Sequence, residues 1–366
     1  MSRNRTLWIA SVVLAAFVGV GAVPANASAR APRPAAAKHR APTAKVTRSR
    51  RPPVSRASSR PPKRRLYSAS RSLSRKAKLA RARAIAAARE TAATTLPRYK
   101  VDASGDLVPD VRAAAAIIYD PITQQVLWEE NSQTPRSIAS ITKVMTATVF
   151  LETDPDLSRE VTVERSDVFR ASTTFLRAGD RLRVDDLLHL LLIPSDNAAA
   201  RALARVSPYG SEGFVRRMNE KAAELGLENT HYADPSGLLS DNVSSAYDMA
   251  RLITLASGNE RISSIMRTPE YTIQTNRRTI TVRSTDHLLG RDDVDVRAAK
   301  TGFISKSGYC LATLLRLPEG QHDVAVVVLG ARSNAARFLE VRNLFSWLSS
   351  KSSTFFATKT PVPDPQ

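Results

Sequence analysis

Residues 137–146 read SIASITKVMT and place Ser140 three positions before Lys143, in a segment that otherwise looks like the start of a buried helix. An unpaired ammonium is costly there, because removing it from water costs roughly several kcal/mol unless the charge is matched or neutralised. Residues three apart on a helix share a face and can touch. Two interpretations follow: either the Lys143 side chain extends to the surface, or its amine acts on the Ser140 hydroxyl.

Residues 1–29 have the layout of a cleaved secretory signal, with two arginines, an apolar run, and small residues at Ala25, Ala27 and Ala29. The alternative is a retained transmembrane anchor, but the apolar run is slightly short and is followed by an A-x-A cleavage pattern. We therefore expect an exported protein that is periplasmic or associated with the cell wall.

The net charge of +20 is concentrated in residues 30–89, which contain twenty Lys and Arg and no Asp or Glu. Pro, Ala, Ser and Arg dominate this stretch, so it cannot bury enough apolar surface to offset the entropy of ordering it. We predict a disordered basic segment over 30–99, in which the Ala- and Arg-rich run at 74–90 has the composition to become helical on an anionic surface. After export, the segment would bind anionic cell-wall or membrane polymers and not nucleic acid; the alternative is a spacer without a partner.

The foldable part of the chain is predicted over 100–350, with a disordered tail over 351–366. Two apolar runs near its start, AAAAIIYD and QQVLWEE, are joined by a turn containing Asp120 and Pro121, which predicts a hairpin. The run VDDLLHLLLIPSDNAAARALARV predicts a helix that ends near Pro194 and a second helix after a Ser-Asp-Asn turn.

The C-terminal third has the pattern of a sheet. The runs RTITVRSTDHLL, VRAAKTGF, GYCLATLLRL and DVAVVVLGA read as successive strands, and ARFLEVRNLFSWLSS as a closing amphipathic helix that packs on the sheet and not on a membrane. Strands at both ends with helices between them imply one sheet assembled from distant parts of the chain. Cys310, the only cysteine, lies in one of these strands and is predicted to be a packed, inert thiol.

Three short motifs can be read together: Ser140-Ile-Thr-Lys143, Ser195-Asp-Asn197 and Lys300-Thr-Gly302. Each alone is weak, and Ser-Asp-Asn occurs again at 240–242. However, S-x-x-K and K-T-G each occur once, and the three motifs fall at a helix start, between helices and on a strand, in the order that serine acyl-transfer chemistry uses. Together they predict a nucleophilic serine activated by a lysine.

With these motifs, the chain resembles the penicillin-recognising serine D-alanyl-D-alanine carboxypeptidases from about Val111 to Leu348. The segments that carry the resemblance are ASITKVMTA, PSDNAAA, NTHYADPSGLLSDNVSSAYDMA and AKTGFISKSGYCLA, and STDHLLGRDDVDVRAAKTGF is closer to the D,D-endopeptidase subgroup. The duplicate Ser-Asp-Asn belongs to the third segment, so Ser195 is the better candidate for the central motif. The resemblance implies an α/β (α+β), β-lactamase/transpeptidase-like fold, with an antiparallel sheet of N- and C-terminal strands, flanking helices and a mostly helical middle.

The chemistry assigns a role to each motif residue. Neutral Lys143 would act as the base for Ser140, and burial and a second cation, Lys300, would keep it deprotonated. Ser195 would relay a proton to the leaving amine, and Asn197 would hold a substrate amide.

The remaining positions would receive the substrate. Lys300 and Thr301 would bind its terminal carboxylate, and Gly302 would let its backbone lie against the strand. By resemblance, the backbone N–H groups of Ser140 and Phe303 would form the oxyanion hole.

The sequence thus predicts an exported serine D-Ala-D-Ala carboxypeptidase that acts on peptidoglycan stem peptides and is inhibited by β-lactams, with no metal or organic cofactor. A D,D-endopeptidase that cleaves cross-links is the main alternative. A class A β-lactamase is disfavoured because ELGLEN, from Glu224, lacks the E-x-x-L-N spacing of the glutamate that activates water. A non-catalytic wall-binding protein is disfavoured because Ser140, Lys143 and Lys300 are all present. The five histidines show no metal-ligand spacing and are predicted to be structural.

Overall fold

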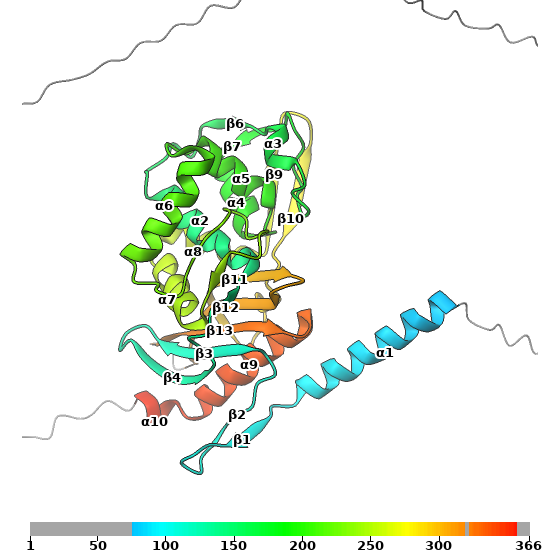
Figure 1. The fold of residues 1–366 in the computed structure, drawn as a ribbon, viewed down its shortest axis with the longest axis vertical. Helices are drawn as coiled ribbons and strands as arrows, with labels where there is room; N and C mark the ends of the chain where they lie inside the picture. The colour runs from blue at the N-terminus through cyan, green and yellow to red at the C-terminus, as the bar shows by residue number, and fades with distance from the viewer. Residues whose placement is uncertain (1–74, 319–321, 357–366) are drawn as a thin grey trace, which may run out of the picture. The chain divides into compact units, whose positions relative to one another are not determined.

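The computed structural model describes residues 75–318 and 322–356, so the predicted signal over 1–29 and the basic stretch up to residue 74 lie outside the described residues. In chain order (Figure 1) the elements are α1 Arg75–Thr95, β1 Tyr99–Val101, β2 Leu107–Pro109, β3 Ala115–Asp120, β4 Gln125–Glu130, β5 Arg136–Ser137, the 3₁₀ helix η1 Ala139–Ile141, α2 Thr142–Leu151, β6 Glu160–Thr162, α3 Arg165–Val168, β7 Arg181–Arg183, α4 Val184–Leu192, α5 Asn197–Val206, α6 Gly210–Glu224, β8 Val243–Ser244, α7 Ala246–Ser257, α8 Glu260–Met266, β9 Glu270–Gln274, β10 Thr279–Arg283, β11 Asp295–Ile304, β12 Gly308–Arg316, β13 Asp323–Ala331, α9 Asn334–Ser350 and α10 Ser352–Phe356.

Five strands form the central sheet in the order β11-β12-β13-β3-β4, and every neighbouring pair is antiparallel (Figure 1). β13 joins the C-terminal strands to the N-terminal hairpin, with Ala325 opposite Tyr119. In the hairpin turn, the Asp120 carboxylate accepts a hydrogen bond from the backbone N–H of Ile122 at 2.9 Å. The predicted hairpin and the prediction of one sheet from distant parts of the chain are both confirmed.

Both faces of the sheet are covered, because successive side chains of a strand point to opposite faces. Along β13, Val324, Val326 and Val328 join a core cluster that contains α9, whereas Ala325, Val327 and Leu329 join a second cluster that contains α7 and the helical region. The continuous apolar run DVAVVVLGA is thus explained by burial on both faces. The prediction that the closing helix packs on the sheet is confirmed.

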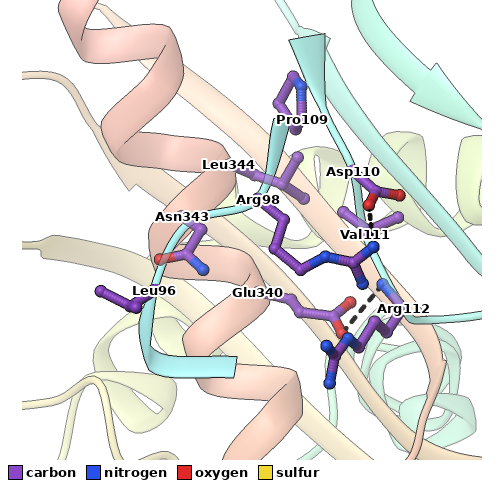
Figure 2. Close-up of a pocket in the computed structure, with 9 residues that line it drawn as sticks. All are labelled: Leu96, Arg98, Pro109, Asp110, Val111, Arg112, Glu340, Asn343 and Leu344. Atoms are coloured by element: carbon purple, nitrogen blue, oxygen red, sulfur yellow. Dashed lines mark hydrogen bonds and ion pairs between the residues drawn. The ribbon is translucent and has the colours of Figure 1, made fainter. Parts of the chain in front are cut away.

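A buried carboxylate on α9 fixes the chain just before β3. Glu340, 4% exposed, accepts a hydrogen bond from the backbone N–H of Arg112 at 3.2 Å (Figure 2). It also accepts one from the backbone N–H of Ala113 at 3.0 Å. Nearby, Arg98 and Asp110 form an ion pair. These contacts hold the entry to the sheet against its covering helix.

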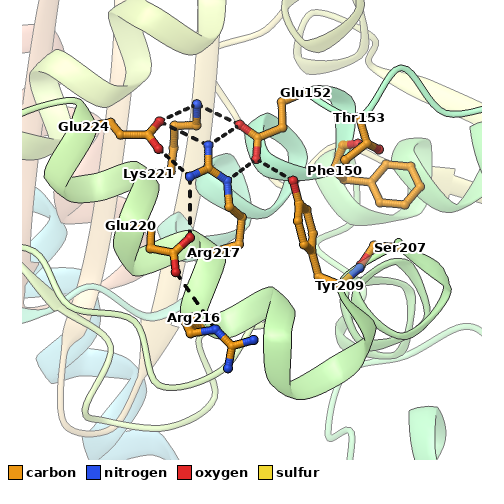
Figure 3. A network of polar contacts seen from close by, with 10 residues as sticks. All are labelled: Phe150, Glu152, Thr153, Ser207, Tyr209, Arg216, Arg217, Glu220, Lys221 and Glu224. Atoms are coloured by element: carbon orange, nitrogen blue, oxygen red, sulfur yellow. Dashed lines mark hydrogen bonds and ion pairs between the residues drawn. The ribbon is translucent and has the colours of Figure 1, made fainter. Parts of the chain in front are cut away.

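An ion-pair network fixes the C-terminal end of α2 to α6 (Figure 3). The Glu152 carboxylate receives the Arg217 guanidinium at 2.6 Å and the Lys221 ammonium at 2.7 Å, and both cations also contact Glu224. We call Glu152, Arg217, Lys221 and Glu224 the α2–α6 network. It anchors the helix whose other end carries Lys143.

The structure differs from the expectations in three places. The run RTITVRSTDHLL forms a strand only over Thr279–Arg283, and this strand pairs with β9 in a separate two-stranded sheet, with its alternate residues buried. Within the segment predicted to be disordered over 30–99, α1 spans Arg75–Thr95, where Ala and Arg have high helix propensity. The five-residue helix α10 likewise lies in the predicted tail over 351–366. No helix in the described part of the chain is both long and apolar enough to span a membrane.

Candidate active site

The segment that carries Ser140 has an unusual backbone. It lies in η1, immediately after β5 and before α2, and the preceding residue Ala139 has φ +49°. A non-glycine residue in this region costs about 1–3 kcal/mol, and such strain clusters at functional sites. The turn presents the Ser140 hydroxyl at the N-terminal end of α2, one helical turn before Lys143.

The Lys143 side chain is fully buried and does not reach the surface. Its Nζ donates hydrogen bonds to Ser140 Oγ at 3.0 Å, Asn197 Oδ1 at 2.6 Å and the Ser236 carbonyl oxygen at 2.6 Å. None of these partners is a carboxylate, and burial lowers the Lys143 pKa from 10.5 to about 7. The amine is therefore placed and tuned to exchange a proton with the serine hydroxyl near neutral pH.

A second buried lysine faces the same site. Lys300 is 1% exposed, and its Nζ donates to Ser195 Oγ at 2.9 Å and to the Thr301 carbonyl oxygen at 3.1 Å. Burial lowers its pKa well below the ordinary value, and repulsion from Lys143 lowers it further. Burial is also the first cause of the lowered Lys143 pKa; the Asp234 and Asp196 carboxylates oppose it, and Arg201, not Lys300, is the cation that lowers it further. Lys143 therefore disfavours protonation of Lys300, whereas the neutrality that the sequence analysis expected Lys300 to give Lys143 comes from burial.

The Ser-Asp-Asn turn between α4 and α5 brings its three side chains to different partners. Ser195 has φ +66° and faces Lys300. Asp196 caps α5 by accepting a hydrogen bond from the backbone N–H of Ala199 at 2.9 Å. Asn197, the first residue of α5, accepts from Lys143 and donates from Nδ2 to the Ala171 carbonyl oxygen at 2.7 Å. The helix start therefore fixes the side-chain amide that binds the Lys143 amine.

The duplicate motif at 240–242 organises a loop that faces Lys143 through its backbone. Asn242 Nδ2 donates to Asp234 Oδ2 at 2.9 Å, and the Asp234 carboxylate accepts from the backbone N–H of Ser236 at 2.6 Å. This arrangement aims the Ser236 carbonyl oxygen at the Lys143 amine. The loop supplies a backbone acceptor, whereas Ser195 supplies the hydroxyl beside Lys300.

Strand β11 lies directly against the nucleophile segment. A Cβ at Gly302 would approach the Ile138 carbonyl oxygen to 2.5 Å, so glycine is needed for this packing, in addition to any role toward substrate. On either side, Thr301 Oγ1 lies 2.6 Å from Thr285 Oγ1, and the half-exposed Phe303 ring stacks on Tyr309 at 4.2 Å between centroids.

A cavity of about 520 Å³ collects most of the predicted residues. Six of them line it: Ser140, Ser195, Asn197, Thr301, Gly302 and Phe303. The other two, Lys143 and Lys300, are buried and reach this lining through their hydrogen bonds to Ser140 and Ser195. We call this the catalytic cavity.

The sequence analysis missed several residues of the catalytic cavity, notably Thr285 and Arg337. The Arg337 guanidinium comes from α9 and donates to the carbonyl oxygens of Gly302 at 3.0 Å and Cys310 at 3.2 Å. Burial lowers its pKa to about 10. In sequence, Arg337 reads as the polar face of an amphipathic helix, so no local signal distinguishes it.

The remaining chemically active side chains lie elsewhere. Cys310 is buried, which raises its thiol pKa. The prediction of a packed thiol is confirmed, and its inertness stays a prediction. His189 stacks on Tyr271, and His322 contacts Asp120. Within the described ranges, no cluster of three or more His, Cys, Asp or Glu could hold a metal ion.

A family model described as D-alanyl-D-alanine carboxypeptidase matches residues 102–333, a range that contains all three motifs and every residue lining the catalytic cavity except Arg337. The chain belongs to this family. The predicted resemblance is thereby confirmed, as is the prediction of a serine D-Ala-D-Ala peptidase of the hydrolase class.

Curated relatives carry both activity names. The D-alanyl-D-alanine endopeptidase of Pseudomonas aeruginosa is 34% identical over 246 residues, which cover 66% of this chain and 79% of the relative. The Escherichia coli K12 protein of the same name is 32% identical and covers 66% of this chain and 78% of the relative. The D-alanyl-D-alanine carboxypeptidase DacF of Bacillus subtilis is 30% identical and covers 66% of this chain and 63% of the relative.

Solved structures agree with this family. The crystal structure of the Streptomyces K15 DD-transpeptidase is similar, with a TM-score of 0.61 and 28% identity, and covers 65% of this chain and 97% of that one. The predicted transpeptidase-like fold is confirmed.

Proposed function

We propose that Ser140 attacks the peptide bond that follows a D-alanine in peptidoglycan stem peptides and forms an acyl-enzyme. The observation that carries this assignment is the 3.0 Å contact between the Lys143 amine and the Ser140 hydroxyl, with Lys143 buried and its pKa lowered to about 7. Since serine is a weak nucleophile at its own pKa, a neutral amine within hydrogen-bond reach is the activating group it needs.

In the proposed acylation, Lys143 takes the Ser140 proton as the Oγ bonds to the carbonyl carbon. The resulting oxyanion accepts hydrogen bonds from the backbone N–H groups of Ser140 and Phe303. Ser195, held by Lys300, then passes its proton to the leaving amine as the C–N bond breaks and recovers one from the Lys143 ammonium, so that Lys143 is a neutral amine again. In deacylation, Lys143 takes a proton from water, which adds to the ester, and returns it to Ser140 Oγ.

The same cavity would orient the substrate. Lys300 and Thr301 would receive the carboxylate beyond the scissile bond, since Thr301 lines the β11 wall of the cavity and the Lys300 amine reaches its lining at Ser195. Asn197 would hold an amide of the acyl donor. Gly302 would leave room for the substrate backbone along β11.

The first test is covalent labelling by a fluorescent penicillin, because β-lactams acylate the activated serine of this family. Ser140→Ala should abolish labelling, whereas Ser240→Ala, in the duplicate Ser-Asp-Asn, should leave it unchanged. Persistent labelling of Ser140→Ala would place the nucleophile elsewhere.

We further propose that release of the terminal D-alanine is the main reaction and that cross-link cleavage is the alternative. A carboxypeptidase must accommodate only a small residue beyond the scissile bond, whereas an endopeptidase must admit a second stem. Purified pentapeptide monomers and cross-linked dimers should be digested in parallel. If dimers are cleaved and D-alanine is not released, the endopeptidase assignment replaces the first.

We also propose that residues 1–29 direct export, that the catalytic domain spans about 100–350, and that the basic segment binds anionic cell-wall or membrane polymers. Deleting residues 30–70 should leave hydrolysis of soluble peptides unchanged and reduce sedimentation with isolated cell walls at low salt. The difference should vanish near 1 M salt, where the Debye length falls to about 3 Å. Equal sedimentation at every salt concentration would leave the segment as a spacer.

A further inference from the structure

A second cavity, of about 360 Å³, lies beside the catalytic cavity and has no role in the proposed reaction steps. Its polar lining consists of Arg136, Ser137, Ser240, Asp241 and Lys306. We call it the second cavity.

Three chain segments line both cavities, which makes them neighbours. These segments are the one before α2, the loop before β8 and the turn after β11. In that order, they contribute Ser140, Leu238 and Ser305 to the catalytic cavity. They contribute Ser137, Ser240 and Lys306 to the second cavity. A molecule bound at Ser140 therefore has the second cavity within reach of its side chains.

The wall of the second cavity contains a cation without a partner. A Cβ at Gly330, which has φ +76°, would lie 2.9 Å from Arg136 Nη2, so the guanidinium occupies space that only glycine leaves free. Within residues 75–318 and 322–356, no acceptor hydrogen-bonds this guanidinium, and its Nε is buried. A partly buried cation without a partner is costly, and an incoming carboxylate would remove that cost.

The other walls carry charges of both signs. Lys306 and Asp241 are exposed, and neither forms an ion pair with any described residue. Together with Arg136 they present two cations and one anion to the same space. This set is complementary to a group that carries a carboxylate and an ammonium on one carbon, and a simple anion or cation would satisfy only part of it.

The direction in which a substrate peptide would run along β11 indicates which of its residues lies beside the second cavity. If Lys300 and Thr301 hold the carboxylate beyond the scissile bond, the acyl donor continues along β11 past Phe303 toward the turn that contains Lys306. A strand rises about 3.3 Å per residue, so the residue before the D-alanine lies near the end of β11. Its side chain then lies beside the second cavity.

We propose that the second cavity binds the zwitterionic end of a diamino dicarboxylic acid side chain on the residue that precedes the D-alanine. Arg136 and Lys306 hold its carboxylate, and Asp241 holds its ammonium. This inference rests on the proposed function, and it makes the second cavity a specificity site for the acyl donor.

The test compares three synthetic peptides, each ending in D-Ala-D-Ala, whose preceding residue is meso-diaminopimelate, lysine or norleucine. For the wild type, kcat/KM should be roughly tenfold higher for the diaminopimelate peptide than for the norleucine peptide, as expected for charge-assisted hydrogen bonds that are partly exposed. Lys306→Ala, Arg136→Gln and Asp241→Asn should each reduce this ratio and leave turnover of the norleucine peptide unchanged. Asp292→Asn, at an exposed carboxylate before β11, is the matched control and should keep the ratio.

The outcomes separate the two proposals. Equal kcat/KM for all three wild-type peptides overturns the specificity site, and so does an equal loss on all peptides in the variants. An equal kcat/KM for the lysine and diaminopimelate peptides also overturns the proposal, because the lysine side chain has no carboxylate for Arg136 and Lys306 to bind. If none of the peptides is hydrolysed and Ser140 is not acylated by penicillin, the proposed function itself fails.

Discussion

Lys143 and Lys221 lie on two helices that pack together, α2 and α6, and their pKa values move in opposite directions. Lys143 is fully buried among a hydroxyl, an amide and a carbonyl oxygen, and burial lowers its pKa to about 7. Lys221 lies near the surface between Glu152 and Glu224, and its hydrogen bond to Glu152 raises its pKa (Figure 3). A lysine thus keeps its charge where carboxylates bind it directly near the surface, and its pKa falls where burial outweighs the more distant carboxylates, here Asp234 and Asp196.

The largest expected effect removes the buried amine. Lys143→Met should slow acylation by a fluorescent penicillin by about 10²–10⁴-fold, because Ser140 then lacks its base. Lys221→Met, the matched change in the α2–α6 network, should label at the wild-type rate. Equal labelling rates for the two variants would show that the lowered pKa of Lys143 has no role in acylation.

The pH dependence of acylation should show which form of Lys143 is active. Since the neutral amine is the base, the acylation rate should rise about tenfold per pH unit below the pKa of about 7 and level off above it. Stopped-flow labelling from pH 5 to 9 measures this profile. A rate that falls as pH rises through 7 would mean that the ammonium form is required.

Stability should depend on pH through the same group. The folded-state pKa of Lys143 lies below its ordinary value of 10.5, so the unfolded chain binds more protons between about pH 7 and 10.5. Its contribution to the free energy of unfolding therefore increases with pH across that window, and Lys300 contributes with the same sign. Urea unfolding at several pH values should give a smaller slope for Lys143→Met than for the wild type.

The smallest expected effect lies in the α2–α6 network. Glu152→Gln should lower the free energy of unfolding by about 1 kcal/mol or less, because partly exposed ion pairs are screened by water. The loss should shrink further in 1 M salt, and acylation should be unchanged. Glu228→Gln, at an exposed carboxylate, is the matched control. A loss of acylation in Glu152→Gln would mean that the network positions Lys143.

The sequence allowed prediction of the elements whose signals are local. The β3–β4 hairpin, the helices around Pro194 and the strands β11 to β13 follow from periodicity and turn residues. The pairing of β10 with β9 in a separate sheet could not be predicted, because the residue pattern of a strand does not show which strand it pairs with. The helix α1 lies within the segment predicted to be disordered, and it overlaps the Ala- and Arg-rich run at 74–90 whose composition favours a helix.

The sequence predicted the site residues that belong to short motifs. It did not predict the contacts that form only when distant segments of the folded chain come together. Ser140, Lys143 and Lys300 could be paired from their motifs. Lys143 donates to the Ser236 carbonyl oxygen, and Arg337 donates to the Gly302 carbonyl oxygen. Both contacts join distant segments, and in both the acceptor is a backbone atom. Sequence spacing carries no information on either contact.

The pairing of β13 with β3 has a consequence for the order of synthesis and folding. Ala325 and Tyr119 lie opposite each other across roughly two hundred residues of chain, and such non-local strand pairs form slowly because the loop between them must first close. The ribosome completes Ser140 long before it completes Lys300 or the strands that hold β11 in the sheet. A growing chain therefore carries an ordinary serine hydroxyl, and the reactive nucleophile appears only when the last strand has joined the sheet.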